Sequence, residues 1–335
     1  MRNSPAEIPV IDIANLVGNR SGKVDARLSG EINAAFREIG FLCVVGHGIA
    51  PTLATEMRNV TRRIFDLPEA EKQLAAVRRE NYRGYIPFGF FTPNDGGGSA
   101  DNYEGYKLHR ETSPTDPIRK SCALYGPNIW PAHVPESRSV ILAYWRAMDG
   151  LANHLLSAVA AGLKIDAALM LGALESPLTN MTLLHYPPQK EADCGFGIHP
   201  HKDTDLLTII APDPVGGLEV QTKTGRWISV ECPPGGFVVN IGDMLEVWSG
   251  GQLVSTPHRV VNTSGRERYS FPYFAVPRHD VTVPPLTSPV AGFNRPDVHC
   301  GHWSAEIWRT NWPDESAGKN TPELGTLHDQ PDACS

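Results

Sequence analysis

The spacing of apolar residues predicts helices in the first half of the chain. Apolar residues recur there at every third or fourth position, the period of one face of an α-helix. The helices predicted in this way end at Gly40 or run over about 51–65, 68–79, 136–163 and 166–174. The strongest, at 136–163, is expected to pack against the core along a continuous apolar face: Ile141, Tyr144, Trp145, Met148, Leu151, Leu155 and Val159.

Short strands dominate the pattern from about residue 180. Runs of β-branched and aliphatic residues are separated there by turns, an arrangement typical of a sandwich or barrel. The runs are NMTLLHY, LLTIIAP, GLEVQT, WISVEC, GGFVVNIGD, MLEVWS, HRVVN and RYSFPYFAV. Earlier runs at 8–13 and 41–48 also predict strands, whereas 82–106 lacks periodicity and is predicted to be a long functional loop.

Composition narrows the class of protein. The chain has 335 residues, 41% hydrophobic and 20% charged, which is ordinary for a globular protein of the size of an enzyme. Its formal net charge is −7 and its basic residues are scattered, so a nucleic-acid partner is not expected. No apolar run approaches the roughly 18 residues that a membrane-spanning helix needs. The cysteines form no CxxC pair, and together these features predict a soluble protein of the reducing cytoplasm.

The stretch HPHKDTDLLTII, residues 199–210, contains a polar cluster directly before a predicted strand. His201 and Asp203 lie two residues apart, so on an extended strand both side chains would project to the same face. His258, in STPHRVVN, begins another predicted strand. Two histidines and one carboxylate on rigid strands are the ligand set of a non-haem Fe(II) site. A His-x-Asp pair alone also fits a hydrogen-bonded cluster at a strand end, and His199 is expected to be a wall or surface residue.

Other polar residues near these motifs have simpler interpretations. Lys202 and Asp205 are expected to be ordinary solvated charges at the entrance of the strand. His109 and Arg110 either bind a polar group of a substrate or lie on the surface.

The segment RERYSFPYF, downstream of His258, supplies a second polar pair. Arg268 and Ser270 share one face of the predicted strand, at an even offset from His258 that keeps them roughly on its side. The arginine fork matches a carboxylate with two hydrogen bonds, and the serine hydroxyl adds another donor. A pocket with a metal at one end and this pair at the other fits 2-oxoglutarate, a short dicarboxylate with a 2-oxo acid head.

Segments along the whole chain resemble those of one enzyme family, in the family's order. They are IPVIDI, FREIGFLCVVGHGI, YRGYIP, EGYKL, GPNIWP, LLHYPP, HKDTDLLTII, GGLEVQ, GRWISV, FVVNIGDMLEVWSGG, STPHRVVN and RYSFPYF. Over nearly its full length the sequence resembles the isopenicillin N synthase-like branch of the Fe(II)/2-oxoglutarate-dependent dioxygenases. The resemblance implies a mainly β fold with flanking helices, built on a double-stranded β-helix (jelly roll, cupin-like) core.

The resemblance also implies roles for individual residues. The implied iron ligands are His201, Asp203 and His258, and the implied 2-oxoglutarate contacts are Arg268, Ser270 and Tyr186. The sequence departs from the family at Leu184, where many members have asparagine, which puts any contact of that asparagine in doubt. The implied reaction oxidises a C–H bond of a small organic molecule by hydroxylation, desaturation or cyclisation. Dioxygen is consumed, and 2-oxoglutarate becomes succinate and carbon dioxide.

A single oxygenase domain is expected over 1–312, with a polar tail at 313–335. Its expected parts are a mixed helical region at 1–175, the jelly-roll core with the iron site at 176–280 and a C-terminal cap at 281–312. The resemblance places the substrate side of the iron along 82–110. The residues expected to line the substrate pocket are Tyr85, Phe88, Phe91, Tyr106, Phe274 and Trp303.

Two alternative functions remain open on the sequence. One is an oxidase of the same fold that uses iron and dioxygen without 2-oxoglutarate, with Arg268 and Ser270 holding the substrate. The other is a non-catalytic jelly-roll module that binds a small acid. An acidic protein with an aromatic-rich loop favours a small organic substrate, such as a specialised metabolite or an amino-acid derivative. The sequence does not indicate an oligomeric state.

Overall fold

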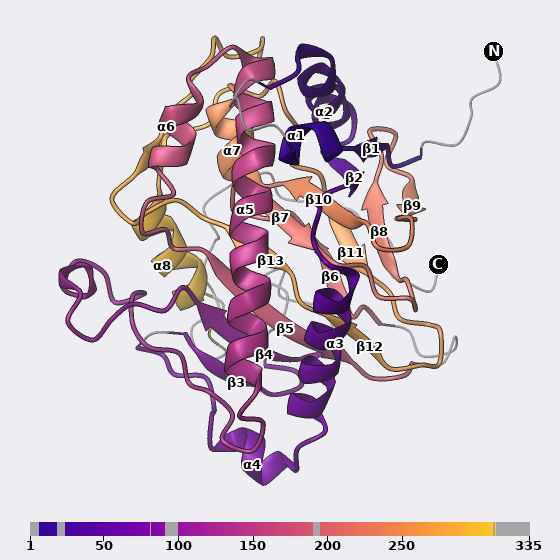
Figure 1. Ribbon diagram of the computed structural model, residues 1–335, viewed down its shortest axis with the longest axis vertical. Coiled ribbons are helices and arrows are strands. Elements are labelled where there is room, and N and C mark those ends of the chain that lie inside the picture. Colours follow the sequence, from indigo (N-terminus) through magenta and orange to yellow (C-terminus); the bar gives the residue numbers. More distant parts are fainter. Residues whose placement is uncertain are drawn as a thin grey trace.

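The computed structural model describes residues 7–18, 24–80, 82–90, 100–189, 195–310 and 312. Two β-sheets enclose an apolar cluster, and helices cover the outer face of the larger sheet (Figure 1). The longest helix, α5 (Ser137–Leu163), runs across the strands of that sheet and packs against four other described helices.

The larger sheet contains nine of the described strands. Their order is β1 (Val10–Asp12), β2 (Phe41–Val45), β10 (Phe237–Ile241), β7 (Leu207–Ile210), β13 (Tyr273–Ala275), β5 (Asn180–Tyr186), β4 (Glu104–His109) and β3 (Gly84–Ile86), with β12 (Arg268–Ser270) also paired to β5. The smaller sheet has the order β6 (Ile198–His201), β11 (His258–Val260), β8 (Leu218–Gln221) and β9 (Trp227–Ser229). A separate pair is formed by β14 (Thr282–Val283) and β15 (Val298–His299).

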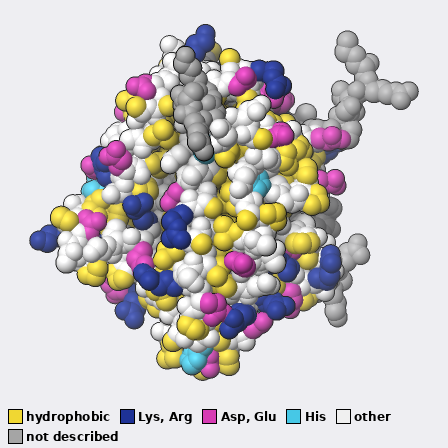
Figure 2. All heavy atoms as spheres, viewed as in Figure 1, with side chains coloured by type: hydrophobic (Ala, Val, Ile, Leu, Met, Phe, Trp, Pro, Cys, Tyr) yellow, Lys and Arg dark blue, Asp and Glu magenta, His cyan; other side chains and the backbone are white. Residues whose placement is uncertain are grey.

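Eight α-helices are found among the described residues. Besides α5 they are α1 (Ala14–Val17), α2 (Ala26–Glu38), α3 (Pro51–Phe65), α4 (Glu69–Gln73), α6 (Ala167–Gly172), α7 (Asp243–Trp248) and α8 (Cys300–Thr310), and a 3₁₀ helix spans Pro117–Lys120. None of these described helices is long and apolar enough to cross a membrane. On the side of the molecule that α5 crosses, basic and acidic side chains are interspersed (Figure 2).

Local signals fix the ends of the principal helices. The carboxylate of Asp25 accepts hydrogen bonds of 2.9 Å from the backbone N–H groups of Arg27 and Leu28, which caps the start of α2. Pro51 is the first residue of α3, where a missing N–H costs nothing. At the end of α5, Lys164 adopts a left-handed conformation with φ of 59° and stops the helix.

Alternation of side chains gives the larger sheet two different buried faces. Met181 and Leu183 of β5 belong to the core that packs against the helices. Leu184 and Tyr186 belong instead to a cluster between the two sheets, which the smaller sheet completes with residues such as Val220. We call the side that packs against the helices the outward face of the larger sheet. The side that faces the smaller sheet is the inward face.

Several predicted elements are confirmed, and the run MLEVWS is misassigned. The helices predicted over 51–65 and 136–163 correspond to α3 and α5, and the short strands after 180 form a sandwich of two sheets. The run MLEVWS was predicted to be a strand, but it forms most of helix α7. Its residues Met244, Leu245, Val247 and Trp248 are all buried, a spacing that fits one side of a helix as well as a buried strand.

The region predicted as a helix and a long loop is also corrected. Helix α4 covers only part of 68–79, because the chain then turns to form a bridge between Ala76 and Tyr85. The segment 82–106 was predicted to lack regular structure, but it contains β3 and the start of β4. These strands extend the larger sheet, so the N-terminal part of the chain contributes four of its strands.

Candidate iron and cosubstrate site

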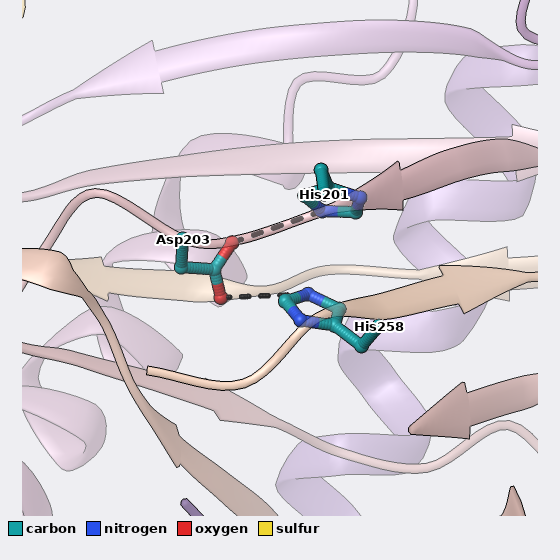
Figure 3. A group of neighbouring side chains, drawn as sticks. All are labelled: His201, Asp203 and His258. Atoms are coloured by element: carbon teal, nitrogen blue, oxygen red, sulfur yellow. Dashed lines mark ion pairs between the residues drawn. The ribbon is translucent and has the colours of Figure 1, made fainter. Parts of the chain in front are cut away.

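The predicted metal ligands converge on the space between the two sheets. His201 is the last residue of β6 and His258 the first of β11, and the two are paired across the antiparallel strands. The carboxylate of Asp203 faces both imidazoles, with one oxygen toward each ring (Figure 3). Asp203 Oδ1 is 3.8 Å from His201 Nε2, and Oδ2 is 3.7 Å from His258 Nε2. The ligand atoms lie within 4.8 Å of one another, close to the separation of about 3–4 Å expected around a metal with bonds near 2 Å.

Asp203 reaches this position from a loop, not from a strand. Strand β6 ends at His201, so the expectation that both residues share one strand is corrected. The carboxylate is held instead by the larger sheet. Its Oδ2 accepts hydrogen bonds from Thr208 Oγ1 at 2.5 Å and from Asn240 Nδ2 at 2.7 Å. These two residues are paired across β7 and β10, so the sheet fixes the carboxylate from behind.

Backbone carbonyl groups orient both imidazoles. His201 Nδ1 lies 2.7 Å from the carbonyl oxygen of His199, and His258 Nδ1 lies 3.2 Å from that of Thr256. A carbonyl oxygen only accepts hydrogen bonds, so each Nδ1 carries the proton and each Nε2 presents its lone pair to the centre of the triad. His199 itself bonds Asp101 through Nδ1 at 2.6 Å and contributes to the site through its backbone.

The electrostatics of the triad suit it to bind a cation. Burial alone would raise the pKa of Asp203, but the two histidines and two hydrogen-bond donors bring it below its ordinary value. Burial lowers the pKa of His258 to about 4. Near neutral pH the carboxylate is therefore charged and His258 is neutral, the protonation states that metal ligation requires.

Asp205 is buried, which corrects the expectation of a solvated charge. Its Oδ2 lies 3.0 Å from Thr208 Oγ1, the same hydroxyl that contacts Asp203. Burial and the nearby charge of Asp203 raise the pKa of Asp205 well above its ordinary value. A protonated Asp205 avoids placing two negative charges beside one hydroxyl group.

Arg268 is buried on the inward face and has an unsatisfied donor. Its Nε donates a hydrogen bond of 2.6 Å to the backbone oxygen of Gly216. The adjacent Gly217 has φ of +84°, and a Cβ there would lie 2.4 Å from the backbone oxygen of Val261, so only glycine fits. Nη1 of Arg268 is buried without a hydrogen-bond partner among the described residues. A carboxylate would satisfy this group, which is the fit expected for 2-oxoglutarate.

The structure brings Ser270 and Tyr186 to the same face as Arg268. Arg268 is paired with Tyr186 across β12 and β5, and its guanidinium carbon lies 4.6 Å from the centre of the tyrosine ring. Ser270 is buried and paired with Leu184. Many family members have asparagine at the position of Leu184. In this chain the leucine side chain packs in the apolar cluster between the sheets.

Comparisons with known proteins identify the family. Residues 178–277 match the model of the 2OG-Fe(II) oxygenase superfamily, and residues 8–133 match the model described as non-haem dioxygenase in morphine synthesis N-terminal. Homoarginine-6-hydroxylase 2-ODD-233 of Oryza sativa subsp. japonica is 33% identical over 299 residues, covering 83% of this chain and 88% of the relative. The chain belongs to the 2OG-Fe(II) oxygenase superfamily.

Solved structures of other oxygenases have the same architecture. A 2OG-Fe(II) oxygenase family protein from Caulobacter crescentus aligns with a TM-score of 0.76 and 27% identity, over 90% of this chain and 98% of that chain. JOX2, solved in complex with 2OG, Fe and JA, aligns with a TM-score of 0.76 and 26% identity, over 95% and 90%. The predicted double-stranded β-helix is confirmed, and this oxygenase is an Fe(II)- and 2-oxoglutarate-dependent dioxygenase that acts on a small organic molecule.

The residues predicted to line the substrate pocket are divided between the two faces. Tyr85 and Tyr106 are cross-strand partners on the outward face, with their hydroxyl groups bonded to Glu104 and to the backbone of Ile129. The structure therefore does not bring these two tyrosines to the triad. Phe88, 46% exposed, lies on the outward side as well, with its ring 6.1 Å from that of His185.

The remaining predicted pocket residues have different positions. Phe274 is paired with both Thr208 and Asn180, so it lies on the inward face beside the residue that holds Asp203. Trp303 is in α8, half-buried, and its Nε1 has no partner among the described residues. Phe91 and the polar tail at 313–335 lie outside the described residues.

Three inward-facing residues were not identified from the sequence. Thr208 and Asn240 each stand inside an otherwise apolar strand, in LTII and FVVNI, and such an interruption is a usable signal of a polar function. Lys107 stands in EGYKLH, two residues before His109, and the alternation of a strand places both on the inward face. His109 is buried, so the alternative of a surface position is excluded.

Proposed function

We propose that His201, Asp203 and His258 bind the Fe(II) of this oxygenase, and that Arg268, Ser270 and Tyr186 bind the distal carboxylate of 2-oxoglutarate. One observation carries the proposal. The three ligand atoms converge within 4.8 Å, and the inward face next to them holds a buried guanidinium with an unpartnered nitrogen. The donor set of two imidazoles and a carboxylate is the one that non-haem Fe(II) oxygenases use.

When bound, Fe(II), 2-oxoglutarate and dioxygen supply the oxidation of a substrate C–H bond, with 2-oxoglutarate converted to succinate and carbon dioxide. The residues of the chain hold and shield these groups. Asp203 supplies the negative charge of the ligand set and is kept in place by Thr208 and Asn240. Arg268 neutralises the distal carboxylate where water is excluded, so the cosubstrate binds in one orientation.

The proposed substrate is a small specialised metabolite or amino-acid derivative, and hydroxylation is the proposed outcome. The homoarginine-6-hydroxylases that are 30–33% identical to this chain support a hydroxylase. The free thiols of Cys43, Cys122, Cys232 and Cys300 are compatible with a reducing compartment, and we propose the cytoplasm.

Oxygen uptake and succinate formation measured on the same sample test the proposal. The protein is supplied with Fe(II), 2-oxoglutarate and a panel of small organic compounds. We expect equal amounts of oxygen consumed and succinate formed, with no succinate from His258→Ala. Oxygen uptake without succinate would favour an oxidase that does not use 2-oxoglutarate, and the lack of both would contradict an oxygenase.

A further inference from the structure

A lysine is buried on the inward face of the larger sheet. Lys107 of β4 is only 3% exposed and is paired with Thr182 of β5 and with Gly84 of β3. Long cationic side chains are rarely buried unless a partner compensates the charge. The surroundings of Lys107 therefore indicate whether it serves the fold or a ligand.

The partners of Lys107 are neutral. Its Nζ donates hydrogen bonds to Asn180 Oδ1 at 2.6 Å and to Thr182 Oγ1 at 2.9 Å. Among the described residues no carboxylate lies within 4 Å of Nζ. An ammonium group has three N–H donors, so one remains after these two bonds. The charge also lies over two aromatic rings, 4.3 Å from the centre of Trp308 and 5.1 Å from that of Phe274.

Lys107 lies on the same face of the larger sheet as Thr208, the residue that holds Asp203. Its neighbour Asn180 is paired with Phe274, and Phe274 is paired in turn with Thr208, whose hydroxyl contacts Asp203. A continuous row of inward-facing side chains thus runs from the lysine to Thr208, which holds the Asp203 carboxylate of the triad. Burial lowers the pKa of Lys107 to about 7, opposed by attraction to Asp205 and Asp203.

A second unsatisfied polar atom lies beside Lys107. His109 Nε2 is 3.2 Å from the backbone oxygen of Tyr82, so this nitrogen carries the proton and Nδ1 is an acceptor. Nδ1 is buried without a hydrogen-bond partner among the described residues. The ring of His109 also contacts that of Trp308, which places both unsatisfied groups against one tryptophan.

We propose that Lys107 binds a carboxylate group of the primary substrate, whose apolar part packs against Phe274 and Trp308 while its reacting C–H bond faces the triad. This inference rests on the proposed function and specifies its substrate class as small monocarboxylic acids. A single cation fits one negative charge. The nearby charged carboxylate of Asp203 would oppose a second charge on the ligand, which disfavours phosphate esters.

Binding of matched acids and amides tests the proposal. The probes are phenylacetate, 3-phenylpropionate and hexanoate, each compared with its primary amide by calorimetry under anaerobic conditions. The protein is loaded with Fe(II) and saturated with 2-oxoglutarate, so that the Arg268 site is filled. We expect at least one acid to bind about 10-fold to 100-fold more tightly than its amide, the range for a hydrogen bond to a buried charge. Equal binding of acids and amides, including no binding of either, would overturn the proposal.

Lys107→Met removes the charge while retaining a long side chain between the two aromatic rings. We expect this variant to bind Fe(II) and 2-oxoglutarate as the wild type does but to lose the preference for acids. Lys223→Met, at an exposed lysine with a surface ion pair to Glu38, is the matched control and should keep the preference. A preference that survives in Lys107→Met would overturn the proposal. If that variant does not fold, the comparison of acids with amides on the wild type still tests the proposal.

Failure of the proposed function would give a different result from failure of this inference. It would be seen in the wild type before any acid is added, as absent binding of Fe(II) or 2-oxoglutarate.

Discussion

Two buried lysines lie on opposite sides of β4, and they differ in their partners. On the outward side, Lys72 Nζ lies 2.6 Å from Glu104 Oε2 and 3.2 Å from Glu69 Oε2. On the inward side, Lys107 Nζ donates hydrogen bonds to a neutral amide oxygen and a hydroxyl and lies over two aromatic rings, with no carboxylate partner among the described residues. The outward charge is compensated within the chain, whereas the inward charge is left for a ligand. Burial alone therefore does not distinguish a structural lysine from a functional one. The groups that the ammonium contacts make the distinction.

The same contrast extends over both faces of the sheet. On the outward face, Glu104 also accepts hydrogen bonds from His185 and Tyr85, which ties β3, β4 and β5 together. On the inward face, unpartnered atoms of Arg268 and His109 lie in the same layer as the metal ligands. We therefore expect changes on the inward face to affect binding and turnover, and changes on the outward face to affect stability.

Loss of a metal ligand should have the largest effect. His258→Ala leaves one imidazole and one carboxylate, and we expect turnover of 2-oxoglutarate to fall more than about 100-fold, because residues that merely orient metal ligands are worth roughly 10–100-fold. Succinate formation and iron content measure the change. The outward-facing variant His185→Gln is the control and should retain iron. Full iron content and turnover in His258→Ala would contradict the assignment of the triad.

Removal of the Arg268 guanidinium should weaken the binding of 2-oxoglutarate and leave the binding of iron unchanged. For Arg268→Ala we expect the apparent affinity for 2-oxoglutarate to fall about 50-fold, in the range for hydrogen bonds between charged groups. Iron binding should be unchanged, which separates this effect from loss of the metal. Calorimetry with 2-oxoglutarate measures it, with the exposed Arg27→Gln as control. An unchanged affinity in Arg268→Ala would place the cosubstrate elsewhere.

Removal of the outward lysine should instead destabilise the fold. Lys72→Met leaves Glu104 buried, and we expect a loss of about 2 kcal/mol in the free energy of unfolding, since Glu104 keeps His185 and Tyr85 as partners. The affinity for 2-oxoglutarate should not change. Denaturant unfolding of Lys72→Met beside Lys107→Met measures the contrast. A larger loss in Lys107→Met would reverse the roles assigned to the two lysines.

The pH dependence of stability should show the smallest effect. Burial opposes ionisation of both His185 and Glu104, but their mutual hydrogen bond helps to raise the pKa of His185 above 6.5 and to lower that of Glu104 below 4.5. Stability from His185 is complete below its unfolded pKa and is lost as pH rises through the higher folded value. Stability from Glu104 is complete above its unfolded pKa and is lost as pH falls through the lower folded value.

The two contributions overlap between about pH 4.5 and 6.5. The difference in unfolding free energy between the wild type and His185→Gln should therefore be largest in that window and should shrink at higher pH. A difference that is constant with pH, or that grows above pH 7, would show that the pair is not ionic.

Most of the fold and the convergence of His201, Asp203 and His258 could be predicted from the sequence because their signals are local or carried by motifs. The apolar period of α5 and the spacing of His201 and Asp203 require no knowledge of tertiary contacts. The run that forms α7 was misassigned because a short apolar run has no distinct period, and its burial comes from neighbouring elements.

The residues that face the space between the sheets were harder to predict, because strand register determines which side chains point there. Tyr85 and Tyr106 are aromatic and lie in the segment predicted to line the substrate side, but a shift of one residue along a strand moves a side chain to the other face. Lys107 is adjacent to Tyr106 and faces the opposite way. Only the pairing of β4 with β5 shows which of the two neighbours lies on the inward face.

An anaerobic titration with Fe(II) and then 2-oxoglutarate, followed by visible absorption, tests the central claim most directly. The claim is that the space between the two sheets binds iron through the triad and 2-oxoglutarate through Arg268. We predict a metal-to-ligand charge-transfer band in the wild type, no band in His258→Ala, and a band in Arg268→Ala only at much higher 2-oxoglutarate concentration. A band that persists in His258→Ala, or that needs the same 2-oxoglutarate concentration in Arg268→Ala as in the wild type, would contradict the account.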